Sequence, residues 1–177
     1  SFCTPCLPGE FYEEIDGAPT CTVCRPGYFA NVSGMTACLP CLSGSSEEGS
    51  SYCEDCKAGT YFDRSQEPAI CVMCPLGEIS ASGESTCTPC EAGTYANEDG
   101  TKCISCPSGT WSDVIGASSS DVCTPCPAGS FSGATGVNSE EGCNACPPGT
   151  KGVSEGATSV SDCEDCAAGT FTSSGGQ

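Results

Sequence analysis

Twenty cysteines dominate the chemistry of this 177-residue chain, and all of them occur in ten Cys-x-x-Cys pairs. Two thiols at this spacing can bind a metal ion, act as a redox dithiol, or form disulfides with cysteines elsewhere. The segments CTPCEAGTY from Cys87 and CISCPSGTW from Cys103 show that the pair is copied together with its surroundings. A sulfur motif repeated at a steady interval indicates tandem repeats.

Zinc is the first alternative, because two pairs separated by about 14 residues are close to a four-cysteine zinc spacing. Such centres would add negative charge to a chain with a net charge of −18, only five basic residues and no histidine. A redox dithiol needs a cation or a helix N-terminus that stabilises its thiolate, and most of the ten pairs have no basic neighbour. We therefore predict neither a metal nor another cofactor.

Disulfides are the favoured use of these cysteines, and they indicate an oxidising compartment. Leu, Ile, Val and Phe make up 23 of the 177 residues, a share that is typical of disordered chains when crosslinks are absent. Repeats of 15–20 residues are also too short to hold a hydrophobic core of their own. We predict that crosslinks stabilise the fold and that the protein is extracellular, secreted or at the cell surface.

Two disulfide pairings remain open. In a ladder, the second cysteine of each pair bonds to the first cysteine of the next, and each loop of about 15 residues contributes ~3 kcal/mol in the chain-entropy model. The ladder comprises Cys6–Cys21, Cys24–Cys38, Cys41–Cys53, Cys56–Cys71, Cys74–Cys87, Cys90–Cys103, Cys106–Cys123, Cys126–Cys143 and Cys146–Cys163. It leaves Cys3 and Cys166 for units beyond the ends, as in a fragment of a longer array. The rival scheme, which we favour less, forms five double units that begin with Cys3–Cys21 and Cys6–Cys24.

A turn and a short hairpin must position these cysteines. Glycine stands three residues after every second cysteine, where a turn with positive φ or a close backbone approach requires it. An aromatic residue or isoleucine follows two residues later in eight repeats, with Ser46 and Lys151 as the exceptions, and we expect this side chain to cover the disulfide and the neighbouring unit. The pattern predicts irregular β-hairpins pinned by disulfides, with little or no helix.

The repeats divide the chain into short units. Their approximate bounds are 3–20, 21–37, 38–52, 53–70, 71–86, 87–102, 103–122, 123–142, 143–162 and an incomplete 163–177. Only the two residues inside each Cys-x-x-Cys join consecutive loops, and such a joint has little freedom to bend. The predicted fold class is therefore small disulfide-rich repeats that together form an elongated, stiff rod.

Catalytic chemistry is not predicted, and the chain is not expected to be an enzyme. The lack of histidine excludes Ser-His and Cys-His nucleophiles. Acidic pairs such as Glu140–Glu141 need a cleft to serve a glycosidase, so we interpret them as solvated surface charge. The same charge opposes binding to nucleic acid. The triplet Asn31-Val32-Ser33 is an N-glycosylation acceptor and predicts a glycan on Asn31.

CISCPSGTW and CTPCPAGSF, from Cys103 and Cys123, resemble the ephrin-receptor-like cysteine-rich repeat, whose pattern is Cys-x-x-Cys-Pro-x-Gly-Thr-Tyr/Phe; CLPCLSGSS from Cys38 lacks the aromatic residue. The chain is also similar to the opening module of tumour-necrosis-factor-receptor repeats, and this resemblance implies the ladder. Both resemblances concern the fold more than the function. Long uninterrupted arrays look like those of protist and algal extracellular proteins, such as mastigoneme filaments and ciliate surface antigens.

Two functions remain open. The even repeats favour a structural extracellular protein, a stiff disulfide-stapled rod in a filament, a flagellar appendage or a cell-surface coat. The alternative is a ligand-binding or adhesion ectodomain of a cell-surface receptor, with exposed aromatic or basic residues outside the repeat rule. We expect the partners to be further copies of the chain, other matrix or coat proteins and glycans, without nucleic acid and without membrane insertion of this segment.

Overall fold

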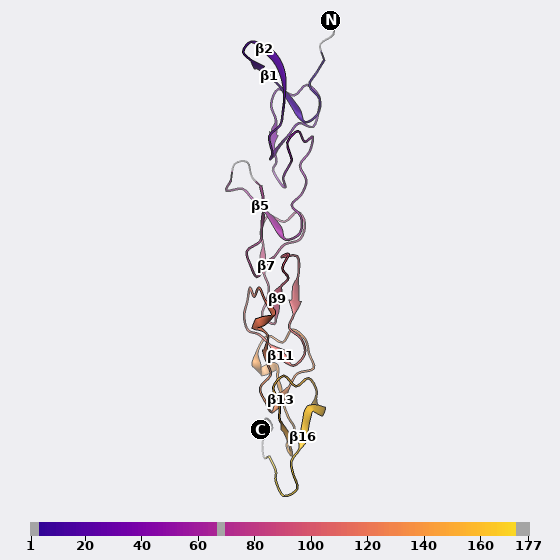
Figure 1. Cartoon of the computed structure of the whole chain (residues 1–177), viewed down its shortest axis with the longest axis vertical. Helices are drawn as coiled ribbons and strands as arrows, with labels where there is room; N and C mark the ends of the chain where they lie inside the picture. Colours follow the sequence, from indigo (N-terminus) through magenta and orange to yellow (C-terminus); the bar gives the residue numbers. More distant parts are fainter. Residues whose placement is uncertain (1–3, 67–69, 173–177) are drawn as a thin grey trace. The chain divides into compact units, whose positions relative to one another are not determined.

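The computed structural model describes residues 4–66 and 70–172, and short antiparallel hairpins are its main elements (Figure 1). The chain divides into two compact units: unit 1 comprises residues 1–74 and 80–87, and unit 2 comprises residues 75–79 and 88–177. The described residues form eight two-stranded sheets, each made of strands that are consecutive along the chain. The prediction of small disulfide-rich hairpin repeats with little helix is confirmed.

Unit 1 contains three hairpins. They are β1 (Glu10–Ile15) with β2 (Ala18–Val23), β3 (Tyr28–Phe29) with β4 (Leu39–Pro40), and β5 (Thr60–Asp63) with β6 (Ile70–Met73). Asp16 and Gly17 link β1 to β2 with φ of +52° and +77°, the backbone form that suits a two-residue hairpin loop. In the repeat that begins at Cys38, which lacks the aromatic residue, Ser45 forms an isolated bridge with Glu54 in place of a further hairpin.

Unit 2 contains five hairpins, whose short strands follow one another along the unit (Figure 1). They are β7 (Glu78–Ile79) with β8 (Thr88–Pro89), β9 (Thr94–Ala96) with β10 (Cys103–Ser105), β11 (Thr110–Trp111) with β12 (Thr124–Pro125), β13 (Ser130–Phe131) with β14 (Asn144–Ala145), and β15 (Thr150–Gly152) with β16 (Cys163–Asp165).

Three single-turn 3₁₀ helices explain why the later repeats are longer. They are η1 (Ser120–Val122), η2 (Glu140–Gly142) and η3 (Val160–Asp162). Each directly precedes the first cysteine of the next pair, in the three places where consecutive first cysteines are 20 residues apart. The additional residues therefore form a tight turn, and the hairpin keeps its geometry.

The joint between repeats is itself a strand. β12 consists of the two residues between Cys123 and Cys126, and it pairs with Thr110 and Trp111 of β11. Of the segment TWSDVI, residues 110–115, only the first two residues, Thr110 and Trp111, belong to β11. Backbone pairing restrains a joint that is already short.

Sulfur and small side chains make up the buried core. The second cysteines Cys24, Cys90, Cys106 and Cys126 are fully buried. The residue three positions after the glycine is buried in most repeats, as at Ala30, Phe62, Ser80, Ala96, Ser112 and Ser132. By contrast, the rings two positions after the glycine are half-buried, and Phe171 is 82% exposed. These rings are therefore not part of the fully buried core.

Candidate functional site

Nine disulfides are the first component of the candidate site. Each joins the second cysteine of one pair to the first cysteine of the next, across 12–17 residues of sequence and with Cα–Cα separations of 5.5–5.8 Å. They are Cys6–Cys21, Cys24–Cys38, Cys41–Cys53, Cys56–Cys71, Cys74–Cys87, Cys90–Cys103, Cys106–Cys123, Cys126–Cys143 and Cys146–Cys163. Cys166 forms no disulfide within the described residues, and Cys3 lies outside them. The structure thus has the ladder arrangement.

The glycine loop is the second component, and we use this term for the turn at the glycine three residues after each second cysteine. All ten of these glycines have positive φ, between +73° and +90°. At Gly109, a β-carbon would overlap the carbonyl oxygen of Gly156, which belongs to the next repeat but one. Both the backbone conformation and the close contact therefore require glycine here.

The Gly109 loop is held by backbone hydrogen bonds to the following repeat. The Gly109 amide donates to the Ser132 carbonyl at 2.7 Å, and the Cys126 amide donates to the Gly109 carbonyl at 2.8 Å. The carbonyl oxygen of Gly156 lies against the same loop. We call this set of contacts, made by a buried second cysteine, the residue six positions after it and a glycine of the next repeat, the glycine socket.

The glycine socket recurs in both units. Gly93 occupies a socket made by Cys106, Ser112 and Gly136, and its hydrogen bonds to Ser112 and Cys106 are both 2.8 Å long. Gly9 occupies a socket made by Cys24, Ala30 and Gly49, again with two bonds of 2.8 Å. Disulfides and glycine sockets together attach each of these repeats to the two that follow it.

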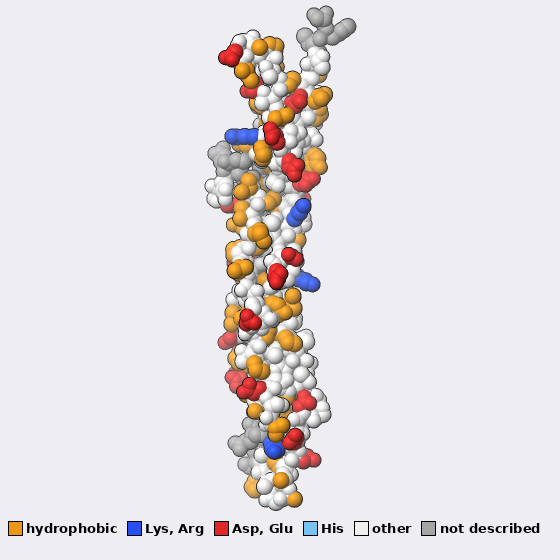
Figure 2. Space-filling model, in the orientation of Figure 1, with side chains coloured by type: hydrophobic (Ala, Val, Ile, Leu, Met, Phe, Trp, Pro, Cys, Tyr) orange, Lys and Arg blue, Asp and Glu red, His pale blue; other side chains and the backbone are white. Residues whose placement is uncertain are grey.

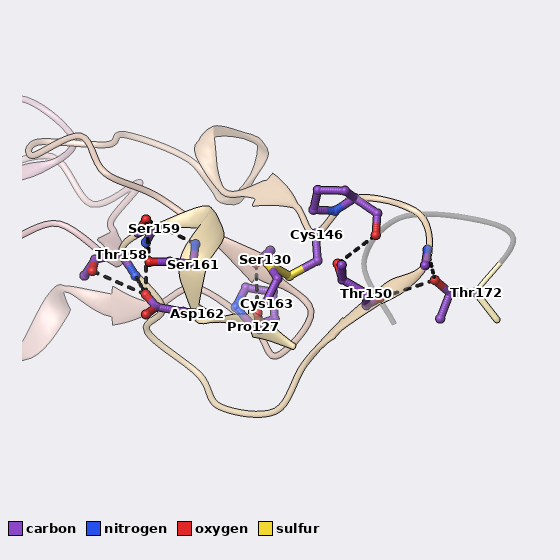
Figure 3. The surroundings of a disulfide bond; sticks show 12 residues. Pro127, Ser130, Cys146, Thr150, Thr158, Ser159, Ser161, Asp162, Cys163 and Thr172 are labelled. Atoms are coloured by element: carbon purple, nitrogen blue, oxygen red, sulfur yellow. Dashed lines mark hydrogen bonds between the residues drawn. A yellow bond between two sulfur atoms is a disulfide. The ribbon is translucent and has the colours of Figure 1, made fainter. Parts of the chain in front are cut away.

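Asp162 fixes the turn that leads into the last disulfide (Figure 3). Its carboxylate accepts hydrogen bonds from the backbone amides of Thr158, at 2.9 Å, and Ser159, at 3.0 Å. These two bonds hold the pKa of Asp162 below its ordinary value, and the bond from Thr158 has the larger effect. The ionised side chain therefore stabilises η3 and the approach to Cys163.

Acidification should loosen η3. Because the pKa of Asp162 is lowered in the folded chain, its contribution to stability is complete above the ordinary aspartate pKa and disappears as the pH falls through the lowered value. Amide hydrogen exchange at Thr158 and Ser159, corrected for intrinsic rates, should accelerate over that acidic range. Asp162→Asn should show the faster exchange already at neutral pH. If the exchange rate changes neither on acidification nor in the Asp162→Asn variant, Asp162 does not stabilise η3.

Glu140 and Glu141, predicted as solvated surface charge, are both solvent-exposed. Figure 2 shows the acidic side chains dispersed among hydrophobic and uncharged ones. Within residues 4–66 and 70–172, no group of three or more His, Cys, Asp or Glu side chains is arranged to hold a metal ion. A polar pocket of about 430 Å³ in unit 1 is lined in part by Ser46, Tyr52 and Lys57.

Asn31 is exposed, as glycosylation requires. When the chain is secreted by a eukaryotic host, we expect one N-glycan there, removable by an amidase specific for N-glycans. Asn31→Gln and Ser33→Ala should each abolish the mass increase, whereas Asn138→Gln, also exposed but outside any acceptor triplet, should retain it. Unmodified Asn31 in such material would contradict the prediction.

A family model described as "Tyrosine-protein kinase ephrin type A/B receptor-like" matches residues 77–123 and again residues 119–163. Residues 77–163 are therefore similar to ephrin-receptor-like cysteine-rich repeats. The matched ephrin-receptor-like repeats contain the hairpins β7–β8 to β11–β12 and β13–β14, together with the sockets occupied by Gly93 and Gly109. The matched part of the chain thus includes residues that attach one repeat to the next.

A human protein named "Signal peptide, CUB and EGF-like domain-containing protein 2" is 30% identical to this chain over 80 residues. The aligned region covers 41% of the chain and 8% of that protein, so the chain spans a small part of its relative. The ephrin-receptor-like match and the numerous disulfides indicate an extracellular or cell-surface, receptor-like repeat domain. Among the described residues, no helix is long and apolar enough to cross a membrane.

One member of the glycine socket, the residue six positions after the second cysteine, was not predicted. Ala30, Ser112 and Ser132 are buried there, although serine alone in a sequence does not indicate burial. A signal was present, because a small residue recurs at a fixed position after the aromatic one. The tightness of the contact explains it, since the carbonyl of this residue accepts the bond from the glycine loop.

Proposed function

We propose that this chain is a stiff spacer in an extracellular structure such as a filament, a flagellar appendage or a cell-surface coat. Its task is to hold other parts of that structure at a fixed separation. The human relative has a signal peptide, CUB and EGF-like domains in its name, which supports a place outside the cell for repeats of this type.

The observation that carries this proposal is the recurrence of one set of backbone contacts in unit 2. The Ser112 amide donates to the Val137 carbonyl at 3.0 Å, and the Ser132 amide makes the same bond to Ala157, also at 3.0 Å. Trp111 and Phe131 form parallel bridges with Val137 and Ala157. Such bonds make bending between repeats costly, because a bend would leave buried amides without partners.

Small-angle X-ray scattering at low and high salt tests the proposal. A chain stiffened by its hydrogen bonds and disulfides should scatter as a thin rod and keep its maximum dimension as salt rises. Acidic self-repulsion also favours extension, but it is screened at high salt. Contraction at high salt would therefore show that charge alone extends the chain, and a compact or freely jointed profile at low salt would contradict the spacer function.

The polar pocket lined in part by Ser46, Tyr52 and Lys57 supports a second candidate function, that of a ligand-binding ectodomain. Tyr52 is 60% exposed and its hydroxyl donates to the Glu54 carboxylate at 3.1 Å, which raises the pKa of Tyr52. If binding of the chain to cells or matrix proteins is lost in Tyr52→Ala but not in Leu76→Ala, an exposed control in unit 2, this function is favoured. Equal binding by both variants would argue against it.

A further inference from the structure

The backbone register changes at one joint inside unit 1. In each of the eight hairpins, the residue after the loop glycine pairs with the second residue after the next first cysteine, as Thr110 pairs with Pro125. In the repeat of residues 38–52, Ser45 pairs instead with Glu54, the first residue after that cysteine. The disulfide of this repeat spans 12 residues of sequence, against 13–17 for the others. The shortest loop thus has a register that differs by one residue.

This change of register leaves a buried backbone amide without an acceptor. The amides of eight second cysteines donate to the loop glycine of the preceding repeat, at 2.8–3.0 Å. The amide of Cys56 makes no such bond to Gly44 and donates to no other group within residues 4–66 and 70–172, although Cys56 is only 2% exposed. Buried amides in native proteins are paired with protein, water or ligand. An acceptor from outside the chain would complete this position.

A small side chain leaves space beside the same joint. Eight repeats have an aromatic residue or isoleucine two positions after the loop glycine, whereas the repeat of residues 38–52 has Ser46, whose hydroxyl donates to the Tyr28 carbonyl at 2.8 Å. Ser46 and Cys56 both line the polar pocket of about 430 Å³, and all of its lining residues belong to unit 1. The pocket therefore lies where a ring is missing and the register changes.

Hydrogen-bonding side chains make up most of the remaining lining. Glu54 and Asp55 bring carboxylates, Lys57 brings an ammonium group, and Ser50 and Thr60 bring hydroxyls. Carboxylates accept hydrogen bonds, ammonium groups donate them, and hydroxyls do both. A ligand that matches this lining must itself carry several groups that both donate and accept, which is the chemistry of a sugar.

Tyr52 adds an apolar face to the pocket. Its side chain is 60% exposed, and its hydroxyl donates to the Glu54 carboxylate at 3.1 Å, which fixes the outer end of the ring. A tyrosine ring offers a large apolar surface with few rotatable bonds. The C–H face of a sugar ring can pack on such a surface while its hydroxyls meet the polar lining.

We propose that this pocket binds a sugar residue of an uncharged glycan. The Tyr52 ring packs against the C–H face of the sugar. The carboxylates of Glu54 and Asp55 accept hydrogen bonds from its hydroxyls, and the Cys56 amide donates to one of its oxygens. Because acidic side chains outnumber Lys57 in the lining, sialylated and sulfated glycans are repelled. This proposal rests on the second candidate function, the ligand-binding ectodomain, and adds the chemical class of the ligand.

A glycan array tests the ligand class. The labelled, non-reduced 177-residue chain should bind glycans that end in neutral hexoses or N-acetylhexosamines, and it should not bind sialylated or sulfated glycans or lysine-rich peptides printed on the same surface. Binding to none of these probes, or to the charged ones alone, would overturn the proposal. If binding to cells or matrix proteins were still lost in Tyr52→Ala, the ectodomain function would survive that result without the glycan.

Filling the pocket tests its position. Ser46→Phe restores the ring that most repeats have and should weaken binding to the glycans found on the array on the order of tenfold or more. Lys151→Phe restores a ring in the other exceptional repeat, in unit 2, and should bind like the unmodified chain. An unchanged thermal midpoint would show that Ser46→Phe remains folded. Equal glycan binding by these two variants would overturn the proposal.

The exposed ring gives a test that does not depend on refilling the interior. Tyr52→Ala should weaken glycan binding on the order of tenfold, whereas Tyr52→Phe keeps the packing face and should stay within about threefold of the unmodified chain. Tyr12→Ala removes another exposed tyrosine of unit 1 and should leave binding unchanged. Binding that survives in Tyr52→Ala, or that is lost equally in Tyr12→Ala, would contradict a sugar site at Tyr52.

Discussion

Replacing Cys126 and Cys143 together by serine should lower the free energy of unfolding by about 3–5 kcal/mol, as loss of a native disulfide does in small secreted domains. This bond closes a 17-residue separation, and Cys126 is fully buried. The surrounding core contains serine, alanine and glycine, which bury little apolar surface to offset the loss. Thermal unfolding followed by circular dichroism should show the decrease, and limited proteolysis should cut between residues 127 and 142.

The matched control is Cys166→Ser. Cys166 is half-buried and forms no disulfide within the described residues, so this substitution should leave both the thermal midpoint and the proteolytic pattern unchanged. If the double variant unfolds like the unmodified chain, the disulfide does not hold this repeat, and apolar contacts must be stronger than the structure indicates.

The second large effect is expected from Gly109→Ala, which should destabilise the chain by about 3 kcal/mol. A residue other than glycine in this backbone region costs ~1–3 kcal/mol, and the added β-carbon would also overlap the Gly156 carbonyl oxygen. The loop would have to leave its socket, so its hydrogen bonds to Ser132 and Cys126 would be lost. Hydrogen exchange of the Gly109 and Cys126 amides should accelerate together.

Gly17→Ala separates the two causes. Gly17 has a similar φ of +77°, but a β-carbon there meets no described atom within 4 Å. This variant should lose only about 1 kcal/mol, the conformational part of the cost. Equal destabilisation by the two substitutions would mean that the contact with Gly156 contributes nothing.

The fold was predictable at positions where one backbone requirement selects one residue type. Glycine after each second cysteine predicted a turn with positive φ, and all ten of these positions have it. The hairpins were also predicted, because a short stretch that begins with Thr110 and Trp111 follows the turn and lies between two cysteine pairs. The extra residues before Cys123 gave no such signal, since one 3₁₀ turn has no hydrophobic period.

The contacts between repeats were not predictable from local sequence. Serine is mostly an exposed residue type, and the roles of Ser132 and Gly156 appear only when the Gly109 loop is placed against them. The degree of burial of the rings was likewise not predictable: Phe131 has the size of a core residue but is half-buried. Sequence spacing indicated which repeats are neighbours, whereas backbone packing determined which atoms touch.

Peptide mapping without reduction tests the central claim, which is that bonds from second to first cysteines hold successive glycine loops in their sockets. After blocking of free thiols and proteolysis, mass spectrometry should identify peptides joined by Cys106–Cys123 and by Cys126–Cys143, as in the structure. Peptides joined by Cys103–Cys123 and Cys106–Cys126, or thiols blocked throughout the chain, would contradict the ladder and the sockets that depend on it.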